Sequence, residues 1–271
     1  MPRSVIPCVL CGIRAWVIPS RKTLVLPADV AVKAKLSLNP TFCAPCQQSL
    51  PFLNPSGCPQ CAIEDTGGHL CGVCIAHPPK FDATIAAFRY QFPLDRLVQD
   101  YKFNANFALL ELFATALADR MIDAGNVPEV IVPVPLSRQR IASRGFNQAA
   151  LLADAVAQKL NASQGVRVEK TWLEKVRDTP AQAGLPLEAR RRNIRDAFTL
   201  SASGAAALKA QPNLKIALLD DVITTGATLS EAAKVLKNAG AVHVTAIVVA
   251  RVPPPRAKTQ MQVLSGGNLI G

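Results

Sequence analysis

Eight cysteines form four pairs of the type Cys-x-x-Cys, and all of them lie between residues 8 and 74. The pairs are Cys8/Cys11, Cys43/Cys46, Cys58/Cys61 and Cys71/Cys74. Two thiolates separated by two residues can bind one ion, and two such pairs complete the tetrahedral coordination of zinc. The cysteines therefore predict two structural Zn²⁺ sites. A site filled by four cysteines has no open coordination position, so metal catalysis is not expected there.

The four pairs can be assigned to the two sites in more than one way. The sequential assignment joins the first two pairs and the last two pairs, and the second set then encloses the short loop of a zinc ribbon. The first set would have to span a long insertion. A site made from the middle two pairs therefore stays possible.

A second group of reactive side chains occupies LLDDVITTGAT (218–228). An apolar strand ends on Asp220 and Asp221, and a loop then opens a helix near Thr228. Free backbone N–H groups at a helix start bind anions, Gly226 allows close approach of a ligand, and the threonine hydroxyls can donate to phosphate oxygens. Two carboxylates beside this loop fit a ligand with hydroxyls or a hydrated Mg²⁺ near its phosphate. The pattern indicates a sugar phosphate, and the alternative is an ordinary strand-to-helix turn capped by Asp and Thr.

Arginines are concentrated in residues 137–198, which contain twelve basic and six acidic residues. Arg138, Arg140 and Arg144 precede a helix that begins near Asn147, and Arg177 and the group Arg190–Arg195 follow. Guanidinium groups suit phosphate oxygens, and this interpretation is favoured for Arg144 and Arg177. A solvated helix face is the alternative, favoured for Arg190–Arg192. Asn147, Gln148 and Gln182 are further candidate polar contacts, although Asn147 also suits a helix cap.

The elements that must position these groups alternate between strand and helix. The apolar patterns predict strands at 84–91, 130–136, 215–222 and 243–251, and helices at 107–122, 147–160 and 228–240. Continuous apolar runs are typical of buried parallel strands, so we expect an open, mostly parallel α/β sheet flanked by helices. Ligands of such sheets bind at the carboxyl ends of the strands, where Asp220 and Asp221 lie.

The chain divides into three parts by composition. Residues 1–80 hold all the cysteines, 81–251 hold the strand and helix patterns, and 252–271 lack periodicity and are expected to be a disordered tail. No apolar run is long enough for a signal peptide or a membrane span. Together with reduced, metal-binding thiols, this predicts a cytoplasmic protein. Nothing in the sequence indicates an oligomeric state.

DDVITTGAT closely resembles the phosphoribosyl diphosphate (PRPP) binding motif of type I phosphoribosyltransferases. PVPLSRQRIASRGFNQA (133–149), RDTPAQAGLPLEARRRNIRDAF (177–198) and the cysteine pairs extend the similarity, from Cys8 to Arg251, to the ComF family (ComFC and GntX-like proteins). The resemblance implies a type I phosphoribosyltransferase-like sheet preceded by a double zinc-ribbon module. It also implies that PRPP binds with Mg²⁺.

The same resemblance assigns roles to individual residues. Asp220 and Asp221 would contact the ribose hydroxyls and, with Arg144, support catalysis. The 5′-phosphate would be held by the loop residues Thr224, Thr225, Gly226, Ala227 and Thr228. The turn formed by Pro133, Val134 and Pro135 would lie against the pyrophosphate, and Asn147, Gln148 and Arg177 are the remaining predicted PRPP contacts.

Two functions from different classes follow. The first is a phosphoribosyltransferase that transfers phosphoribosyl from PRPP to an unidentified acceptor and releases pyrophosphate, although no acceptor pocket or general base is evident. The second is a non-catalytic adaptor for DNA uptake that binds single-stranded DNA and retains PRPP binding, because ComF relatives are associated with natural transformation. The net charge of +11 suits either polyanionic ligand.

Overall fold

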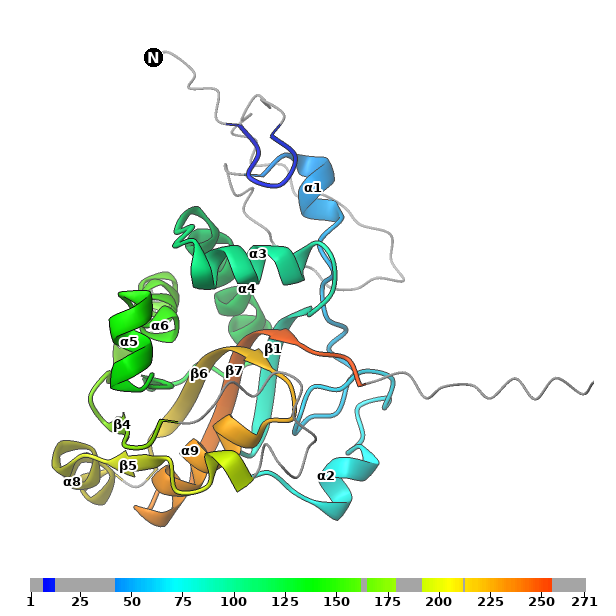
Figure 1. The fold of residues 1–271 in the computed structure, drawn as a ribbon. Helices are drawn as coiled ribbons and strands as arrows, with labels where there is room; N and C mark the ends of the chain where they lie inside the picture. The colour runs from blue at the N-terminus through cyan, green and yellow to red at the C-terminus, as the bar shows by residue number, and fades with distance from the viewer. Residues whose placement is uncertain (1–6, 13–41, 162–164, 179–191, 212, 255–271) are drawn as a thin grey trace, which may run out of the picture.

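The computed structural model describes residues 7–12, 42–161, 165–178, 192–211 and 213–254, and Figure 1 shows their arrangement. Residues 255–271 of the predicted tail lie outside the described residues. The candidate contacts Gln182, Arg190 and Arg191 also lie outside them.

A sheet of five parallel strands occupies the centre of the fold, in the order β1-β7-β6-β2-β3. Its two longest strands, β6 and β7, are almost continuously buried, which explains their uninterrupted apolar sequences. The predicted open, parallel α/β sheet is confirmed. The strands are β1 (Ala83–Arg89), β2 (Val130–Pro133), β3 (Arg167–Val168), β6 (Lys215–Ile223) and β7 (His243–Arg251).

Helices cover both faces of this sheet, and alternate residues along each strand divide the core in two. The first core lies under α3 (Leu94–Phe103), α4 (Ala108–Asp123) and α6 (Gln148–Leu160). The second core lies under α8 (Ala202–Ala210) and α9 (Ala227–Asn238). A short helix, α5 (Arg138–Arg144), precedes α6, and β4 (Leu173–Lys175) pairs antiparallel with β5 (Phe198–Leu200) in a separate small sheet.

The cysteine-rich part contributes the short helices α1 (Ala44–Gln48) and α2 (Gly72–Ala76), which Figure 1 shows well apart. Between them, the chain runs antiparallel beside β1: Leu53 N–H donates to Ala87 O at 3.0 Å, and Arg89 N–H donates to Pro51 O at 2.8 Å. The rings of Phe52 and Phe88 stack with centroids 4.8 Å apart.

Side chains of the cysteine-rich part pack into both halves of the core. Cys8, Phe42 and Leu50 pack into the first core, whereas Leu53 and Ala62 pack into the second. The boundary near residue 80 stays a prediction, and many apolar contacts cross it.

Candidate functional site

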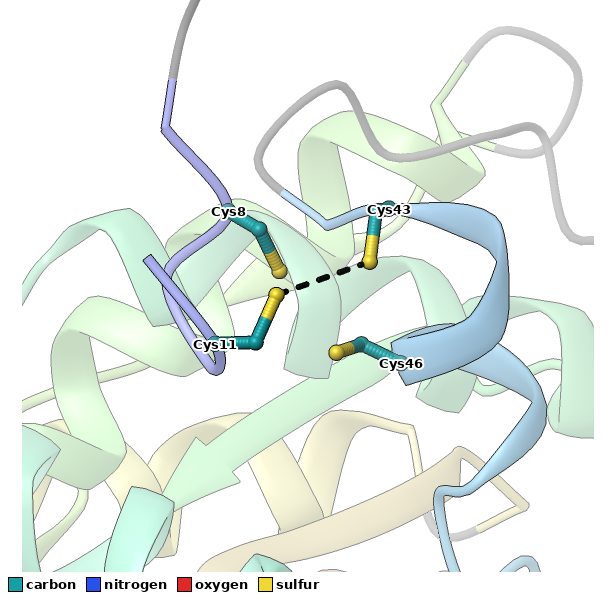
Figure 2. A group of neighbouring side chains, drawn as sticks. All are labelled: Cys8, Cys11, Cys43 and Cys46. Atoms are coloured by element: carbon teal, nitrogen blue, oxygen red, sulfur yellow. Dashed lines mark hydrogen bonds between the residues drawn. The ribbon is translucent and has the colours of Figure 1, made fainter. Parts of the chain in front are cut away.

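The cysteines form two groups of four, and the sequential assignment is the one that the structure adopts. One cluster contains Cys8, Cys11, Cys43 and Cys46, and the other contains Cys58, Cys61, Cys71 and Cys74. Within each cluster the sulfur atoms all lie within 4.8 Å of one another. Figure 2 shows the first cluster, with side chains from both sequence segments converging on one point. We call the two groups the first and the second cysteine cluster.

The sulfur spacing fits zinc. Tetrahedral bonds of about 2.3 Å place neighbouring sulfurs about 3.8 Å apart. The Sγ atoms of Cys11 and Cys43 are 3.8 Å apart, and those of Cys61 and Cys71 are 3.6 Å apart. Both clusters could therefore bind a zinc ion, in agreement with the sequence-based prediction.

Backbone amides prepare one thiol in each cluster for metal binding. Burial raises the pKa of Cys8, but N–H groups that include those of Cys43 and Cys11 outweigh it and lower the pKa to about 6. The pKa of Cys58 is lowered to about 7 in the same way, and the N–H of Cys71 lies 3.4 Å from its sulfur. Burial raises the pKa of Cys46 and of Cys74. Because zinc binds thiolates, metal binding would release the remaining thiol protons.

The acidic pair lies at the carboxyl end of β6, where the neighbouring strand β2 has also ended. Asp221 is buried, and each of its oxygens has a partner: Lys102 Nζ is 2.7 Å from Oδ1, and Gln148 Nε2 donates to Oδ2 at 2.9 Å. Asp220 is only half-buried, and its Oδ1 accepts the N–H of Asp221 at 2.8 Å. The two carboxylates therefore differ: Asp221 anchors a network, whereas Asp220 is more open to a ligand.

The charges of this network influence one another. Burial and the charge of Asp221 raise the pKa of Asp220 to about 7, although Lys102 opposes this effect. Burial lowers the pKa of Lys102, but the attraction of Asp221 outweighs it, so that this pKa is raised. Lys102 is therefore charged at neutral pH, and Asp220 exchanges its proton near neutrality.

The loop after β6 leads directly into the first turn of α9. Gly226 adopts φ +76° and directly precedes α9, and a Cβ atom there would lie 3.3 Å from Cζ of Phe81. Thr225 Oγ1 accepts the N–H of Ala227 at 3.4 Å. A small hollow lies between the loop and Asp220, and its lining includes Asp220, Thr224, Gly226, Ala227 and Thr228. The predicted loop residues are thus grouped beside Asp220.

A chain of contacts connects Asp221 to the arginine-rich segment. Arg144 Nη1 donates to Gln148 Oε1 at 2.5 Å, and the guanidinium lies over the ring of Phe103, 5.1 Å from its centroid. Tyr101 Oη donates to the carbonyl oxygen of Gln148 at 2.7 Å. Gln148 therefore contacts Asp221 directly, and Arg144 is connected to Asp221 through the Gln148 side chain.

Asn147 fixes the turn after β2. Its Oδ1 accepts the N–H groups of Ala149 and Ala150 at the start of α6, and its Nδ2 donates to Val134 O at 3.2 Å. The N–H of Val134 donates to Leu219 O at 2.9 Å. The turn Pro133–Pro135 is therefore held against the strand end that carries Asp220.

Arg177 has a different environment. Its guanidinium donates to the carbonyl oxygens of Asn193, at 3.0 Å, and Arg195. These bonds connect Arg177 to residues 193–195, which follow it in the chain after residues 179–191. Within the described residues, no hydrogen bond or ion pair links Arg177 to the acidic pair.

Two lysines near the acidic pair were missed by sequence reasoning. Lys102 is the second-last residue of α3, a helix that was not predicted from the sequence, and its side chain pairs with Asp221. Lys175 ends β4, where burial and the charge of Arg140 lower its pKa and Asp220 raises it. Neither lysine stands in a sequence pattern that marks it: Lys102 follows Tyr101 and Lys175 follows Glu174.

Comparisons with known proteins agree with this architecture. No protein-family model matches the chain. It is 34% identical over 208 residues to Competence protein F of Haemophilus influenzae, an alignment that covers 73% of this chain and 85% of that protein. The chain belongs to the ComF family.

Other relatives extend the same assignment. DNA utilization protein YhgH of Escherichia coli strain K12 is 31% identical over 193 residues, which cover 69% of this chain and 80% of that protein. Competence protein ComFC of Streptococcus pneumoniae is 26% identical over 252 residues, covering 90% and 99% of the two chains. None of the helices described in this ComF-family protein is both long and apolar enough to cross a membrane.

Proposed function

We propose that this ComF-family protein binds PRPP at the carboxyl end of β6, transfers its phosphoribosyl group to an acceptor, and serves DNA uptake in the cytoplasm. One observation carries the proposal. Asp220 and Asp221 lie near the carboxyl end of β6, before the loop that leads into α9, and the cations Lys102 of α3 and Arg144 of α5 are connected to Asp221, the first directly and the second through Gln148. A ligand with both hydroxyls and phosphates would match this order of groups.

Each part of PRPP has a partner of suitable chemistry. The N–H groups and hydroxyls of 224–228 would hold the 5′-phosphate, and the half-buried Asp220 would accept from the ribose hydroxyls. Lys102 and Arg144 would bind the pyrophosphate together with the turn Pro133–Pro135. Asp221 would keep Lys102 and Gln148 in place. Arg177 would act by ordering the residues around 193–195 that it already binds.

In the reaction, a lone pair of the acceptor attacks C1 of the ribose while the bond from C1 to the pyrophosphate oxygen breaks. The electron pair leaves with pyrophosphate, and positive charge develops on the ring. The protein would supply positioning and charge stabilisation, the usual contributions of a preorganised polar site. Mg²⁺, when bound with PRPP, would neutralise charge on the leaving pyrophosphate, and Asp220 would accept hydrogen bonds from its water ligands.

Calorimetry with PRPP and Mg²⁺ tests binding. We expect the double variant Asp220→Asn/Asp221→Asn to lose measurable affinity and to keep two zinc ions per chain. Asp154→Asn removes a carboxylate that pairs with Lys170 at the surface and serves as the matched control. Unchanged affinity in the double variant would refute the site. Pyrophosphate release across nucleobases and amines then tests catalysis, and bound PRPP with no release above background for any acceptor would refute the transferase.

A non-catalytic, single-stranded-DNA-binding adaptor is the second candidate. Two relatives are named for competence and DNA utilization, and Phe103 is 70% exposed with Arg144 over its ring. Exposed aromatic rings stack with bases, and the cations beside them bind the phosphates. We expect single-stranded DNA binding that weakens steeply with salt and weakens further in Phe103→Ala. A flat salt response, or equal binding by Phe103→Ala, would exclude this surface.

A further inference from the structure

Arg251, the last residue of β7, is a buried arginine, and within the described residues its side chain donates hydrogen bonds only to backbone carbonyls. It is 8% exposed. Its Nε donates to Cys61 O at 2.8 Å, and its Nη1 donates to Thr224 O at 2.5 Å, Val252 O at 2.7 Å and Ile223 O at 3.3 Å. One rigid guanidinium therefore joins a ligand residue of the second cysteine cluster to the loop that precedes α9.

The Cys61 carbonyl is fixed by the tight turn of the second cluster. Ala62 N–H donates to Cys58 O at 2.8 Å, and Cys58 N–H donates to Ile63 O at 2.7 Å. A Cβ atom on Gly57 would lie 2.6 Å from Ile63 O, so the turn tolerates no side chain there. Movement of Cys58 or Cys61 away from a shared ion would consequently displace the acceptor of the Arg251 Nε bond.

A second contact connects the same two regions. The ring of Phe81 lies next to Gly226. The side chain of Gln60 donates from Nε2 to the Phe81 carbonyl oxygen at 3.3 Å. Lys80 N–H donates to Ser230 Oγ in α9 at 3.0 Å. Gln60, Lys80 and Phe81 therefore connect the second cluster to the loop and to α9, and the first cysteine cluster contributes to neither contact.

The charge of Arg251 also fits this arrangement. A buried guanidinium requires a compensating negative charge, and no ion pair among the described residues involves Arg251. Four thiolates around one zinc ion carry a net charge of about −2. The metal-loaded second cluster would supply the missing counter-charge beside the carbonyl that Arg251 already binds.

We propose that Arg251 is a positioning residue that couples the second cysteine cluster to the loop 223–226. Zinc in the second cluster, and not zinc in the first, sets the geometry of the anion-binding loop. The name of the ligand rests on the proposed function, but the coupling does not.

Hydrogen exchange of the amides 222–229 in the zinc-loaded full chain measures the coupling without any ligand. We expect Cys71→Ser to remove one zinc ion and to speed exchange of these amides by about tenfold, because bonds from a charged donor to the loop weaken. Cys43→Ser should remove one zinc ion from the first cluster and leave this exchange unchanged. Equal effects of the two variants would overturn the proposal.

Variants of Arg251 keep the test valid should a cysteine variant fail to fold. Arg251→Met should retain both zinc ions and loosen the loop as Cys71→Ser does, and Arg251→Lys should restore part of the protection by keeping the charge. Arg120→Met is the matched control, since Arg120 also joins the cysteine-rich part to the domain, through Leu53 O, and none of its side-chain hydrogen bonds among the described residues reaches residues 223–226. Unchanged loop exchange in Arg251→Met would refute the coupling. If the loop responds but PRPP binds to no variant, wild type included, the proposed ligand is wrong and the coupling stands.

Discussion

Replacement of Lys102 by methionine is the sharpest test of the acidic network. The Nζ of Lys102 lies 2.7 Å from Asp221 Oδ1, and the two side chains are 21% and 6% exposed. Methionine fills a similar volume without the charge. Asp221 would then be left buried beside Asp220, with Gln148 as its remaining side-chain donor.

The size of the effect follows from this burial. Removing one partner of a buried ion pair costs about 3–5 kcal/mol, and the partial exposure of Lys102 places the expected loss at the lower end, about 3 kcal/mol. At about 2–4 °C per kcal/mol, the melting temperature should fall by roughly 6–12 °C. Lys170 and Asp154 are as close, at 2.6 Å, but 49% and 37% exposed. Lys170→Met should therefore cost less than about 1 kcal/mol.

Thermal unfolding followed by circular dichroism, in zinc-containing buffer near about pH 8, compares the two variants. The loss in Lys102→Met should shrink at lower pH, because the acidic pair takes up a proton as the pH falls through the Asp220 pKa of about 7. Equal losses for Lys102→Met and Lys170→Met would show that Lys102 does not neutralise a buried carboxylate.

Three further predictions concern single residues of the site. Asp220 has a pKa of about 7 in the folded protein and about 4 in the unfolded chain, so the folded state favours the protonated carboxyl. The stability that this preference gives is fully present below about pH 4 and is lost as the pH rises through about 7. Asp220→Asn should therefore raise the melting temperature near about pH 8 and give no gain near about pH 4, and the reverse order would contradict this assignment. Gly226→Ala should cost about 1–3 kcal/mol by denaturant titration, because φ is +76° and the new Cβ meets Phe81. Gly125→Ala, with φ +60° and no atom within 4 Å, should cost less. Asn147→Ala should lower stability by about 1 kcal/mol through loss of the α6 cap, and an unchanged unfolding midpoint would rule out that role.

The central part of the site could be predicted because its determinants are local. The strand predicted at 215–222 and the helix at 228–240 correspond to Lys215–Ile223 and Ala227–Asn238. A continuous apolar run, two carboxylates and a glycine before a helix all lie within one short segment. The cysteine spacing likewise specified two metal sites, although the structure was needed to choose between the assignments.

The remainder depends on contacts between distant residues. Lys102 meets Asp221 only because α3 packs over the end of β6, and no spacing in the sequence indicates such a pairing. The three-residue strands β4 and β5 are too short for a periodic pattern, and they are held by packing of Leu173 and Phe198 in the second core. In the sequence, Arg251 was only the end of a strand, since its role depends on Cys61 and Thr224, which lie far from it along the chain.

The segment 51–53 beside β1 has a consequence for the behaviour of shortened chains. β1 is an outer strand of the sheet, and the hydrogen bonds to Pro51 and Leu53 occupy backbone groups that would otherwise be available for pairing. Open strand edges promote association with other chains. A chain that began at residue 81 would expose this edge and lose apolar side chains from both cores. We therefore expect such a shortened chain to aggregate more readily than the full chain.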